Sequence, residues 1–431
     1  MSLMRTLKEQ WNTVDSPFLI LPENSLRIED LERQTSAHLR NIRQGDVVAL
    51  VGDFDAQSIS DLLTLIEKGV VLVPLSAVTS SDHEYYFETA YVDWIVSNGF
   101  ALRRNHSSRH SLLDELRDRN HAGLILFSTG TTGRPKAILH DMTSFLYRFK
   151  TPRPTMRTLS FLQFDHIGGI NTLFHTLFNR GVVVVPPDRS VNGVLRTCKS
   201  HDVEVLPATP TFLRMMLLSG LIPADISTSL KVITYGTERM DQPTLSELCR
   251  LLPSVDFRQT YGMSELGILR VKSESRNSLF MKVGGEGVET RIENGVLKIR
   301  SKSRMLGYLN SESPFDADGW YDTHDIVELS GEFLKVIGRT TEVINVGGLK
   351  FMASEVERVA LGYPGIAMVQ VIPRNNPVTG QHCELTFTIN RGVKFSLLAF
   401  RSYLKTQLPS HMMPLRIQEG EVAINHRFKK A

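Results

Sequence analysis

The chain carries, at residues 124–137, the stretch LILFSTGTTGRPKA. Its first four residues are apolar and predict a buried strand. The polar part, residues 128–137, combines glycines and small hydroxyl residues with a lysine. Backbone N–H groups and hydroxyls in such a turn can face an anion, and the lysine adds positive charge. The stretch therefore predicts a strand followed by a loop that binds polyphosphate.

The spacing of this loop differs from that of the phosphate loop of kinases and NTPases. That loop has four residues between its two glycines, followed by Lys and then Ser or Thr. Here Gly130 and Gly133 are separated by two residues, and Ala137 follows Lys136 where a hydroxyl would be required. Pro135 also opposes an immediate helix, because the residue before a proline is pushed out of the α region. A kinase or NTPase, which would release ADP, is therefore disfavoured.

Apolar runs alternate with helical stripes through the first half of the chain. Residues 62–66 form a helical stripe that ends at Gly69, and residues 70–75 form an apolar run. The same pattern returns at residues 173–186 and 203–218. Apolar strands separated by helices are typical of parallel sheets that are covered on both faces. We therefore expect an α/β fold with mostly parallel sheets.

The second half of the chain has a different pattern of apolar residues. Shorter strand-like pieces between about residues 280 and 340 predict a small antiparallel or barrel-like section. A helix from about Ser354 and a strand at residues 367–372 then predict a small α+β domain. We expect two domains, 1–337 and 338–431.

Composition and charge limit the function. The 431 residues have a net charge of +3, from 49 basic and 46 acidic residues, so a dedicated nucleic-acid binder is not indicated. The cysteines, Cys198, Cys249 and Cys383, lie far apart, which favours buried thiols in a reducing compartment over disulfides or zinc. No signal peptide is apparent, and no apolar run approaches the ~18 residues of a membrane span. We expect a cytoplasmic protein.

Three later segments add groups that suit a nucleotide site. Residues 259–265, QTYGMSE, place an aromatic ring, a hydroxyl and a carboxylate close together. Residues 321–325, YDTHD, end in an acid that can hold ribose hydroxyls. Residues 338–350, GRTTEVINVGGLK, precede the expected C-terminal helix. These groups suit base stacking, metal binding and phosphate contact.

Taken in this order, the loop and the three segments resemble the adenylate-forming superfamily of acyl-CoA synthetases, luciferases and nonribosomal adenylation domains. The resemblance covers roughly residues 25–431. It implies a mobile C-terminal domain, and ATP and Mg²⁺ as cofactors. It also implies that the β and γ phosphates of ATP are held by Ser128, Thr129, Gly130, Thr131, Thr132 and Lys136.

The resemblance also assigns the remainder of the nucleotide site. The segment that lines the adenine and acyl sites corresponds to Gly236, Thr237 and Glu238. By this resemblance, Tyr261 would pack on adenine, Ser264 would contact the α phosphate and Glu265 would bind magnesium. Asp325 corresponds to the aspartate that binds ribose, and Arg339 to an arginine that binds the nucleotide. Such a site works mainly by positioning and by compensating charge, because attack of a carboxylate on a phosphorus atom needs little proton transfer.

Two further residues correspond to the acid site of this family. His166 matches a position near the substrate carboxylate, although a histidine in an apolar setting is often only a packed core residue. Family members carry Gly-Lys where this chain has Phe428 and Lys429, so Lys429 is assigned as the catalytic lysine, with Lys430 as the alternative. A basic solvated tail is the competing interpretation of this segment.

The resemblance predicts an AMP-forming acid–thiol ligase with an acyl or aryl acid as substrate. Asp165 raises the alternative of an amino acid substrate, but it falls one position early. Gly347 and Gly348 match the glycines beside a pantetheine thiol, so the expected acceptor is CoA or the phosphopantetheine arm of a carrier protein. Thr341 replaces the usual hinge residue and His324 a usual glycine, which leaves a catalytically weak nucleotide-binding homologue as another alternative. The oligomeric state stays open.

Overall fold

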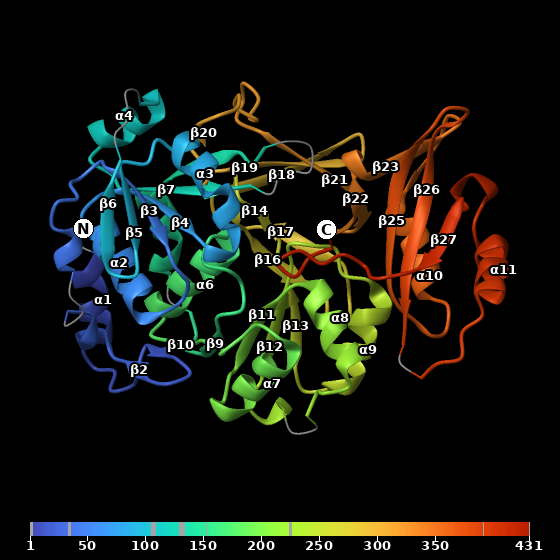
Figure 1. Cartoon of the computed structure of the whole chain (residues 1–431), viewed down its shortest axis with the longest axis horizontal. Coiled ribbons are helices and arrows are strands. Elements are labelled where there is room, and N and C mark those ends of the chain that lie inside the picture. Colours follow the sequence, from blue (N-terminus) through green and yellow to red (C-terminus); the bar gives the residue numbers. More distant parts are fainter. Residues whose placement is uncertain are drawn as a thin grey trace.

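The computed structural model describes residues 3–32, 36–104, 109–128, 134–151, 153–223, 226–390 and 392–430. Two helix-covered sheets and an antiparallel sheet form the larger part of the molecule, and a smaller sheet from the last quarter of the chain stands at one side (Figure 1). The chain end returns from this smaller sheet toward the middle of the molecule. This return positions the site described below.

The first sheet contains the strand that precedes the phosphate loop. Its strand order is β20-β8-β7-β4-β3-β5-β6, with β3, β4, β5 and β7 parallel. The strands are β3 Val47–Val51, β4 Val71–Leu75, β5 Trp94–Ser97, β6 Phe100–Arg103, β7 Gly123–Phe127, β8 Ala137–Asp141 and β20 Gly307–Tyr308. Strand β8 runs antiparallel to β7 because the connection between them, residues 128–136, is too short for a crossover.

The second sheet follows the prediction of a mostly parallel sheet closely. Its order is β13-β12-β11-β9-β10-β1-β2, and only the β1–β2 pair is antiparallel among the pairs described. The strands are β1 Leu19–Ile20, β2 Ser25–Leu26, β9 Arg157–Leu159, β10 Val182–Val184, β11 Val205–Ala208, β12 Val232–Tyr235 and β13 Asp256–Gln259. The predicted fold class is therefore confirmed, with more antiparallel pairing in the first sheet than its apolar runs suggested.

Helices pack on these sheets through apolar stripes that the sequence predicts. The helix α2 spans Ala56–Glu67, begins with the Asp55 side chain accepting from the Ser58 N–H, and leads into β4. In the core beside it, the Trp11 indole donates to the Leu177 carbonyl at 2.9 Å, which joins α1 to α6. The helices of this part are α1 Leu3–Trp11, α3 His83–Thr89, α4 Ser111–Asp118, α5 Met142–Tyr147, α6 Ile167–Phe178, α7 Val191–Ser200, α8 Pro210–Ser219 and α9 Gln242–Leu251.

The predicted barrel-like section is a six-stranded antiparallel sheet, in the order β16-β17-β22-β21-β19-β18. Its strands are β16 Arg270–Ser273, β17 Met281–Gly284, β18 Val288–Glu293, β19 Val296–Ser301, β21 Tyr321–Ser330 and β22 Phe333–Arg339. Alternate residues of β19 are buried, as expected for a strand with one face on a core. The short pair β14 Gly262–Met263 and β15 Gly267–Ile268 lies nearby in the chain.

The last quarter of the chain has a sheet and a core of its own. Its sheet has the order β24-β23-β26-β25, with β27 paired to β26. The elements are β23 Val343–Val346, β24 Leu349–Met352, α10 Ala353–Leu361, β25 Ile366–Asn376, β26 Gly380–Ile389, α11 Leu397–Gln407 and β27 Arg416–Glu419. Its core includes Val356, Phe387 and Phe400, each fully buried. The mixture of helices and strands in this part agrees with the α+β domain predicted from the sequence. The domain boundary at residue 338 and the mobility of this part stay predictions.

Candidate active site

Tyr261, Asp325 and Arg339 form a connected cluster where β21 and β22 run side by side. The Tyr261 hydroxyl donates to Asp325 Oδ2 at 2.5 Å, and Arg339 Nε donates to Asp325 Oδ1 at 2.9 Å. Register places Asp325 directly opposite Arg339 in the sheet. Burial and the adjacent carboxylate raise the pKa of Tyr261 well above its ordinary value, so the phenol stays a donor. Three residues assigned to the nucleotide thus lie together.

The Asp325 carboxylate keeps capacity for a ligand. It is almost fully buried, and each of its oxygens accepts one bond from the cluster. A carboxylate offers about four lone-pair sites, so about two remain for hydroxyl donors such as those of ribose. Its own backbone N–H is held by the Thr323 hydroxyl at 3.0 Å. The contact of Asp325 with a ribose diol stays a prediction.

The base of the predicted phosphate loop is closed by its two ends. The Ser128 N–H donates to the Lys136 carbonyl at 3.0 Å, and the Lys136 N–H donates to Ser128 Oγ at 3.1 Å. The Tyr85 hydroxyl and the Asn310 amide both donate to the Pro135 carbonyl, at 2.8 and 3.1 Å. The assigned residues Thr129, Gly130, Thr131 and Thr132 lie outside the described residues.

Tyr308 joins the loop lysine to the assigned metal ligand. The Lys136 ammonium lies 4.7 Å from the centre of the Tyr308 ring, and the Tyr308 hydroxyl donates to Glu265 Oε1 at 2.8 Å. Sequence reasoning missed Tyr308, which stands on β20 and reaches the site because β20 pairs with β8. One carboxylate suits Mg²⁺ on a nucleotide, because Mg²⁺ takes most of its other ligands from water and phosphate. Glu265 therefore fits the assigned role.

The neighbouring Ser264 is anchored through its backbone. Its carbonyl oxygen accepts from His140 Nε2 at 2.6 Å. Burial lowers the pKa of His140 to about 4, so the ring is neutral and serves as a fixed donor. The contact of Ser264 with the α phosphate stays a prediction.

Gly236, Thr237 and Glu238 follow the carboxyl end of β12. A Cβ at Gly236 would lie 2.6 Å from the Thr260 carbonyl oxygen, so this close approach requires glycine. Thr237 has a φ of 71°, which is a strained value for a β-branched residue and is found here beside the site. Glu238 accepts from the N–H of Thr211 in α8 at 3.2 Å and from that of Lys430 at 2.9 Å. This segment therefore connects the core to the chain end.

His166 caps the N-terminus of α6 and lies in the cavity beside residues of the chain end. Its Nδ1 accepts from the Gly168 N–H at 3.0 Å, which leaves Nε2 as the donor. Burial, with smaller contributions from Lys429 and Arg427, lowers the pKa of His166 well below its ordinary value. A neutral donor beside two cations suits recognition of a carboxylate. His166 lines a cavity in this structure, and its place near a substrate carboxylate stays a prediction.

The last residues fold into a tight turn organised by Asn425. Its Oδ1 accepts from the N–H groups of Arg427 and Lys429 at 2.9 and 3.2 Å, and its N–H donates to the Lys429 carbonyl at 2.8 Å. The turn is bound to the core by Thr209 Oγ1, which donates to the Phe428 carbonyl at 2.6 Å, and by an Arg427–Asp165 contact of 3.4 Å. The described residues 425–430 therefore do not form the basic solvated tail of the competing interpretation. Sequence reasoning missed Asn425 and Arg427.

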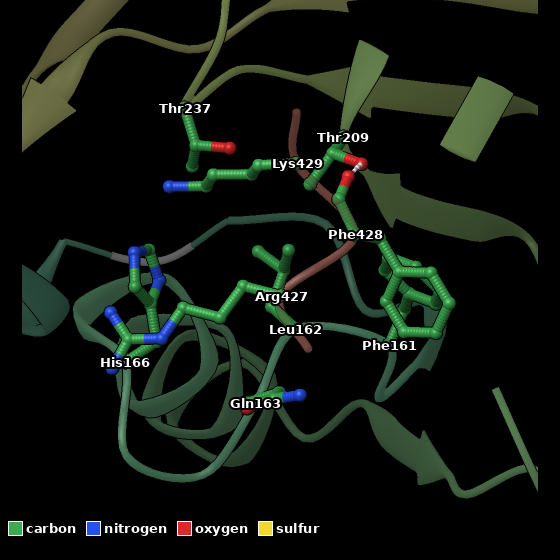
Figure 2. A pocket seen from close by; sticks show the side chains of 9 residues that line it. All are labelled: Phe161, Leu162, Gln163, His166, Thr209, Thr237, Arg427, Phe428 and Lys429. Atoms are coloured by element: carbon green, nitrogen blue, oxygen red, sulfur yellow. Dashed lines mark hydrogen bonds between the residues drawn. The ribbon is translucent and has the colours of Figure 1, made fainter. Parts of the chain in front are cut away.

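The two candidate lysines have different surroundings. Lys429 lies with His166, Thr237 and Arg427 around one small cavity (Figure 2). Burial and the Arg427 charge lower the pKa of Lys429 to about 8, although Glu238 opposes them. The Lys430 ammonium instead pairs with Glu357 of α10 at 3.0 Å. The geometry favours Lys429 as the lysine of the site.

The structure also describes the cysteines, possible metal-ligand clusters and the apolar character of the helices. Cys198, Cys249 and Cys383 are buried free thiols. Within the described ranges, no group of three or more His, Cys, Asp or Glu is arranged to hold a metal ion. In the same ranges, no helix is both long and apolar enough to cross a membrane.

Comparison with known proteins adds a family match and a fold match. The family described as AMP-binding enzyme matches residues 97–308. The chain is 29% identical over 295 residues to a 2-succinylbenzoate–CoA ligase of Bacillus velezensis, covering 61% of this chain and 58% of that protein. It is 25% identical over 285 residues to a fatty acid–[acyl-carrier-protein] ligase of Mycobacterium marinum, covering 56% and 53%. The alignments thus span less than two thirds of either relative.

The fold comparison covers almost the whole chain. The crystal structure of ATP-bound MatB from Rhodopseudomonas palustris has a TM-score of 0.80 to this structure, with 18% sequence identity. The match covers 98% of this chain and 96% of that one. The two chains share a fold from the first sheet to the C-terminal part.

Proposed function

Because this chain belongs to the adenylate-forming superfamily, we propose that it is an AMP-forming acid–thiol ligase. The enzyme activates a carboxylic acid with ATP and passes the acyl group to a pantetheine thiol. One observation carries the proposal: the partly buried Lys429 side chain lines the same cavity as His166 and Thr237. A cation that loses much of its hydration is costly unless an anion is its intended partner.

The first reaction joins the acid to the nucleotide. A carboxylate oxygen attacks the α phosphorus of ATP, the bond to the β-phosphate oxygen breaks, and pyrophosphate leaves. Lys429 and Lys136 offset the repulsion between the two anions, and His166 donates to the carboxylate. Glu265 would hold Mg²⁺, which when bound would supply charge compensation at the phosphates. No side chain needs to remove a proton, which agrees with the neutral state of His166.

The second reaction transfers the acyl group. The thiol loses its proton to solvent and its sulfur attacks the carbonyl carbon of the acyl-adenylate, so that a C–S bond forms and AMP leaves with the C–O electron pair. We propose that residues 338–431 rotate to bring Gly347 and Gly348 to the site, with Thr341 near the hinge. Polar contacts across this boundary include Arg239 with Glu342 at 3.0 Å and Arg214 with the Ala367 carbonyl at 2.5 Å, and the docked turn adds the Phe428 ring packed on Phe161 and Phe212. Such contacts can exchange without exposing a large apolar core.

The acid is proposed to be an acyl or aryl acid. The Asp165 carboxylate contacts the buried Arg427 guanidinium at 3.4 Å, so its charge is already balanced within the protein. An amino acid substrate would need that carboxylate for its ammonium group. The apolar side chains of Phe161 and Leu162 in the cavity lining favour a substituent without charge.

Pyrophosphate release tests the proposal. Purified protein is incubated with MgATP and a panel of acyl, aryl and amino acids, and acyl-AMP is identified by mass spectrometry. We expect acid-dependent pyrophosphate release from ATP, and its loss in Lys429→Ala. Addition of CoA or of a phosphopantetheinylated carrier protein then identifies the acceptor by thioester formation. Binding of ATP without release for any acid would favour the weak nucleotide-binding homologue instead, and ADP as product would indicate a kinase.

A further inference from the structure

Phe428 has a backbone conformation that bulky residues rarely adopt. Its φ is 54°, in the left-handed region where glycine is the usual residue. This strain lies directly before Lys429, at the position where the family that the sequence resembles carries glycine. Strain of this kind persists when the surrounding contacts fix the residue, and it often marks functional sites.

The contacts that fix Phe428 come from two elements of the core. Its ring centre lies 5.1 Å from that of Phe161, just after β9, and 5.7 Å from that of Phe212 in α8. Its carbonyl oxygen accepts from Thr209 Oγ1 at 2.6 Å. Phe161 and Phe212 are themselves fully buried. The ring therefore completes an apolar wall that the core begins.

This wall borders the acid site. Phe161, Phe428, His166 and Lys429 all line one cavity, which has a volume of only about 10 Å³ (Figure 2). That space is close to the volume one water molecule needs. Because consecutive Cα atoms are about 3.8 Å apart, the Phe428 ring cannot be pushed far out without shifting Lys429.

We propose that Phe428 is a specificity-determining residue, carried into the acid pocket by the chain end together with Lys429, and that it restricts adenylation to small acids. The inference rests on the proposed function. An acid with a long substituent meets the ring and displaces it, and the displaced turn draws Lys429 away from the reacting carboxylate. The size of the acid therefore affects the rate of adenylation, the step in which Lys429 acts.

The test compares chain-length profiles. The kcat/KM for pyrophosphate release is measured with acetate, butyrate, hexanoate and octanoate for wild type, Phe428→Gly and Phe428→Leu. Glycine suits the left-handed backbone, so the turn is retained while the ring is removed. Phe100→Leu in β6 is the matched control, because Phe100 is 79% exposed and lies outside the cavity.

We expect wild type and Phe100→Leu to favour the shorter acids. Phe428→Gly should raise the ratio of octanoate to acetate activity by about 100-fold, which corresponds to room for about two more methylenes at roughly 10-fold each. Phe428→Leu should lie between them. Profiles of Phe428→Gly and wild type that run parallel would overturn the proposal.

A binding measurement tests this inference separately from the proposed function. It can also be made on a variant that has lost turnover. Acyl-sulfamoyl adenosines with the same four chain lengths are titrated into each protein by calorimetry. A wild type that releases no pyrophosphate with any acid contradicts the proposed function, whereas a shift of analogue preference toward long chains in Phe428→Gly still supports the role of Phe428. Unchanged analogue preference in an inactive Phe428→Gly variant contradicts that role.

Discussion

In the proposed site, the part assigned to the nucleotide (the nucleotide half) and the part assigned to the acid (the acid half) are built in different ways. In the nucleotide half, Tyr261, Asp325 and Arg339 are bonded to one another, and Asp325 and Arg339 face each other across adjacent strands. In the acid half, His166 comes from the core, whereas Lys429 and Phe428 come from a turn at the chain end. The turn reaches its place through contacts between residues more than 190 positions apart.

The nucleotide half is therefore preorganised, whereas the acid half is assembled when the chain end docks on the core. The nucleotide half keeps its geometry through sheet pairing that a ligand does not need to create. The acid half includes residues of the turn at 425–430, so we propose that its geometry depends on an equilibrium between a docked and an undocked turn. Departures from the usual family pattern, such as Phe428, can be tolerated there because they alter that equilibrium rather than the fold.

The largest expected effect tests the assembled half. Lys429→Ala should lower the rate of acid-dependent pyrophosphate release by about 100- to 1000-fold, the usual effect of removing one preorganised charged donor. The KM for ATP should change much less, because the nucleotide half is intact. Lys430→Ala is the matched control and should lose no more than about tenfold, since Lys430 pairs with Glu357 outside the cavity. Equal losses in both variants would contradict the assignment to Lys429.

The pH dependence follows from the same lysine. Because burial and Arg427 lower the pKa of Lys429 to about 8, its charged form is lost as the pH rises through that value. The kcat/KM for adenylation should therefore fall about tenfold per pH unit above about pH 8. In Lys429→Arg any remaining activity should lack this falling limb, because arginine keeps its proton. If the pH profile of Lys429→Arg keeps the falling limb above about pH 8, a group other than Lys429 causes it.

Docking of the turn should have the opposite pH dependence. The undocked turn binds the Lys429 proton more tightly than the docked turn, whose pKa is lowered. Docking is therefore weakest below about pH 8 and strengthens as the pH rises from there toward 10.5, the ordinary lysine value. Protease cleavage within residues 420–430, followed by mass spectrometry, should slow over this range in the ligand-free protein. A bound anionic nucleotide should remove much of the dependence.

A smaller effect tests the preorganised half. Tyr261→Phe removes the hydroxyl bonded to Asp325, which should raise the KM for ATP by about tenfold, as expected for one hydrogen bond to a charged group. The chain-length preference for acids should stay as in wild type. Tyr403→Phe is the control, because its hydroxyl bonds only the Val359 carbonyl at 3.4 Å among the described residues. A changed acid preference in Tyr261→Phe would show that the two halves are coupled.

The two halves also differ in how far the sequence predicts them. Tyr261, Asp325 and Arg339 stand in short local motifs, and strand pairing brings them together as the motif order implies. Tyr308 was missed because it lies 43 residues from its partner Glu265, on a two-residue strand without a periodic signal. Arg427 was missed because its partner Asp165 is 262 residues away. Long-range pairs of this kind depend on tertiary placement, which local patterns do not encode.

The smallest expected effect concerns His324, beside the nucleotide half. Its φ of 59° explains why glycine is usual at this position, and its side chain is exposed. His324→Val should lower the free energy of unfolding by about 1–2 kcal/mol, because a β-branched residue fits the left-handed region poorly.

His324→Gly should change the free energy of unfolding by less than about 1 kcal/mol, since the relief of strain is offset by the greater freedom of the unfolded chain. Denaturant unfolding measures both variants, with the KM for ATP as a check on the site. A KM that rises in His324→Gly would mean that the imidazole contacts the nucleotide. An unchanged KM would mean that the nucleotide half tolerates this departure as a purely local strain, unlike the strain at Phe428, which acts on the acid.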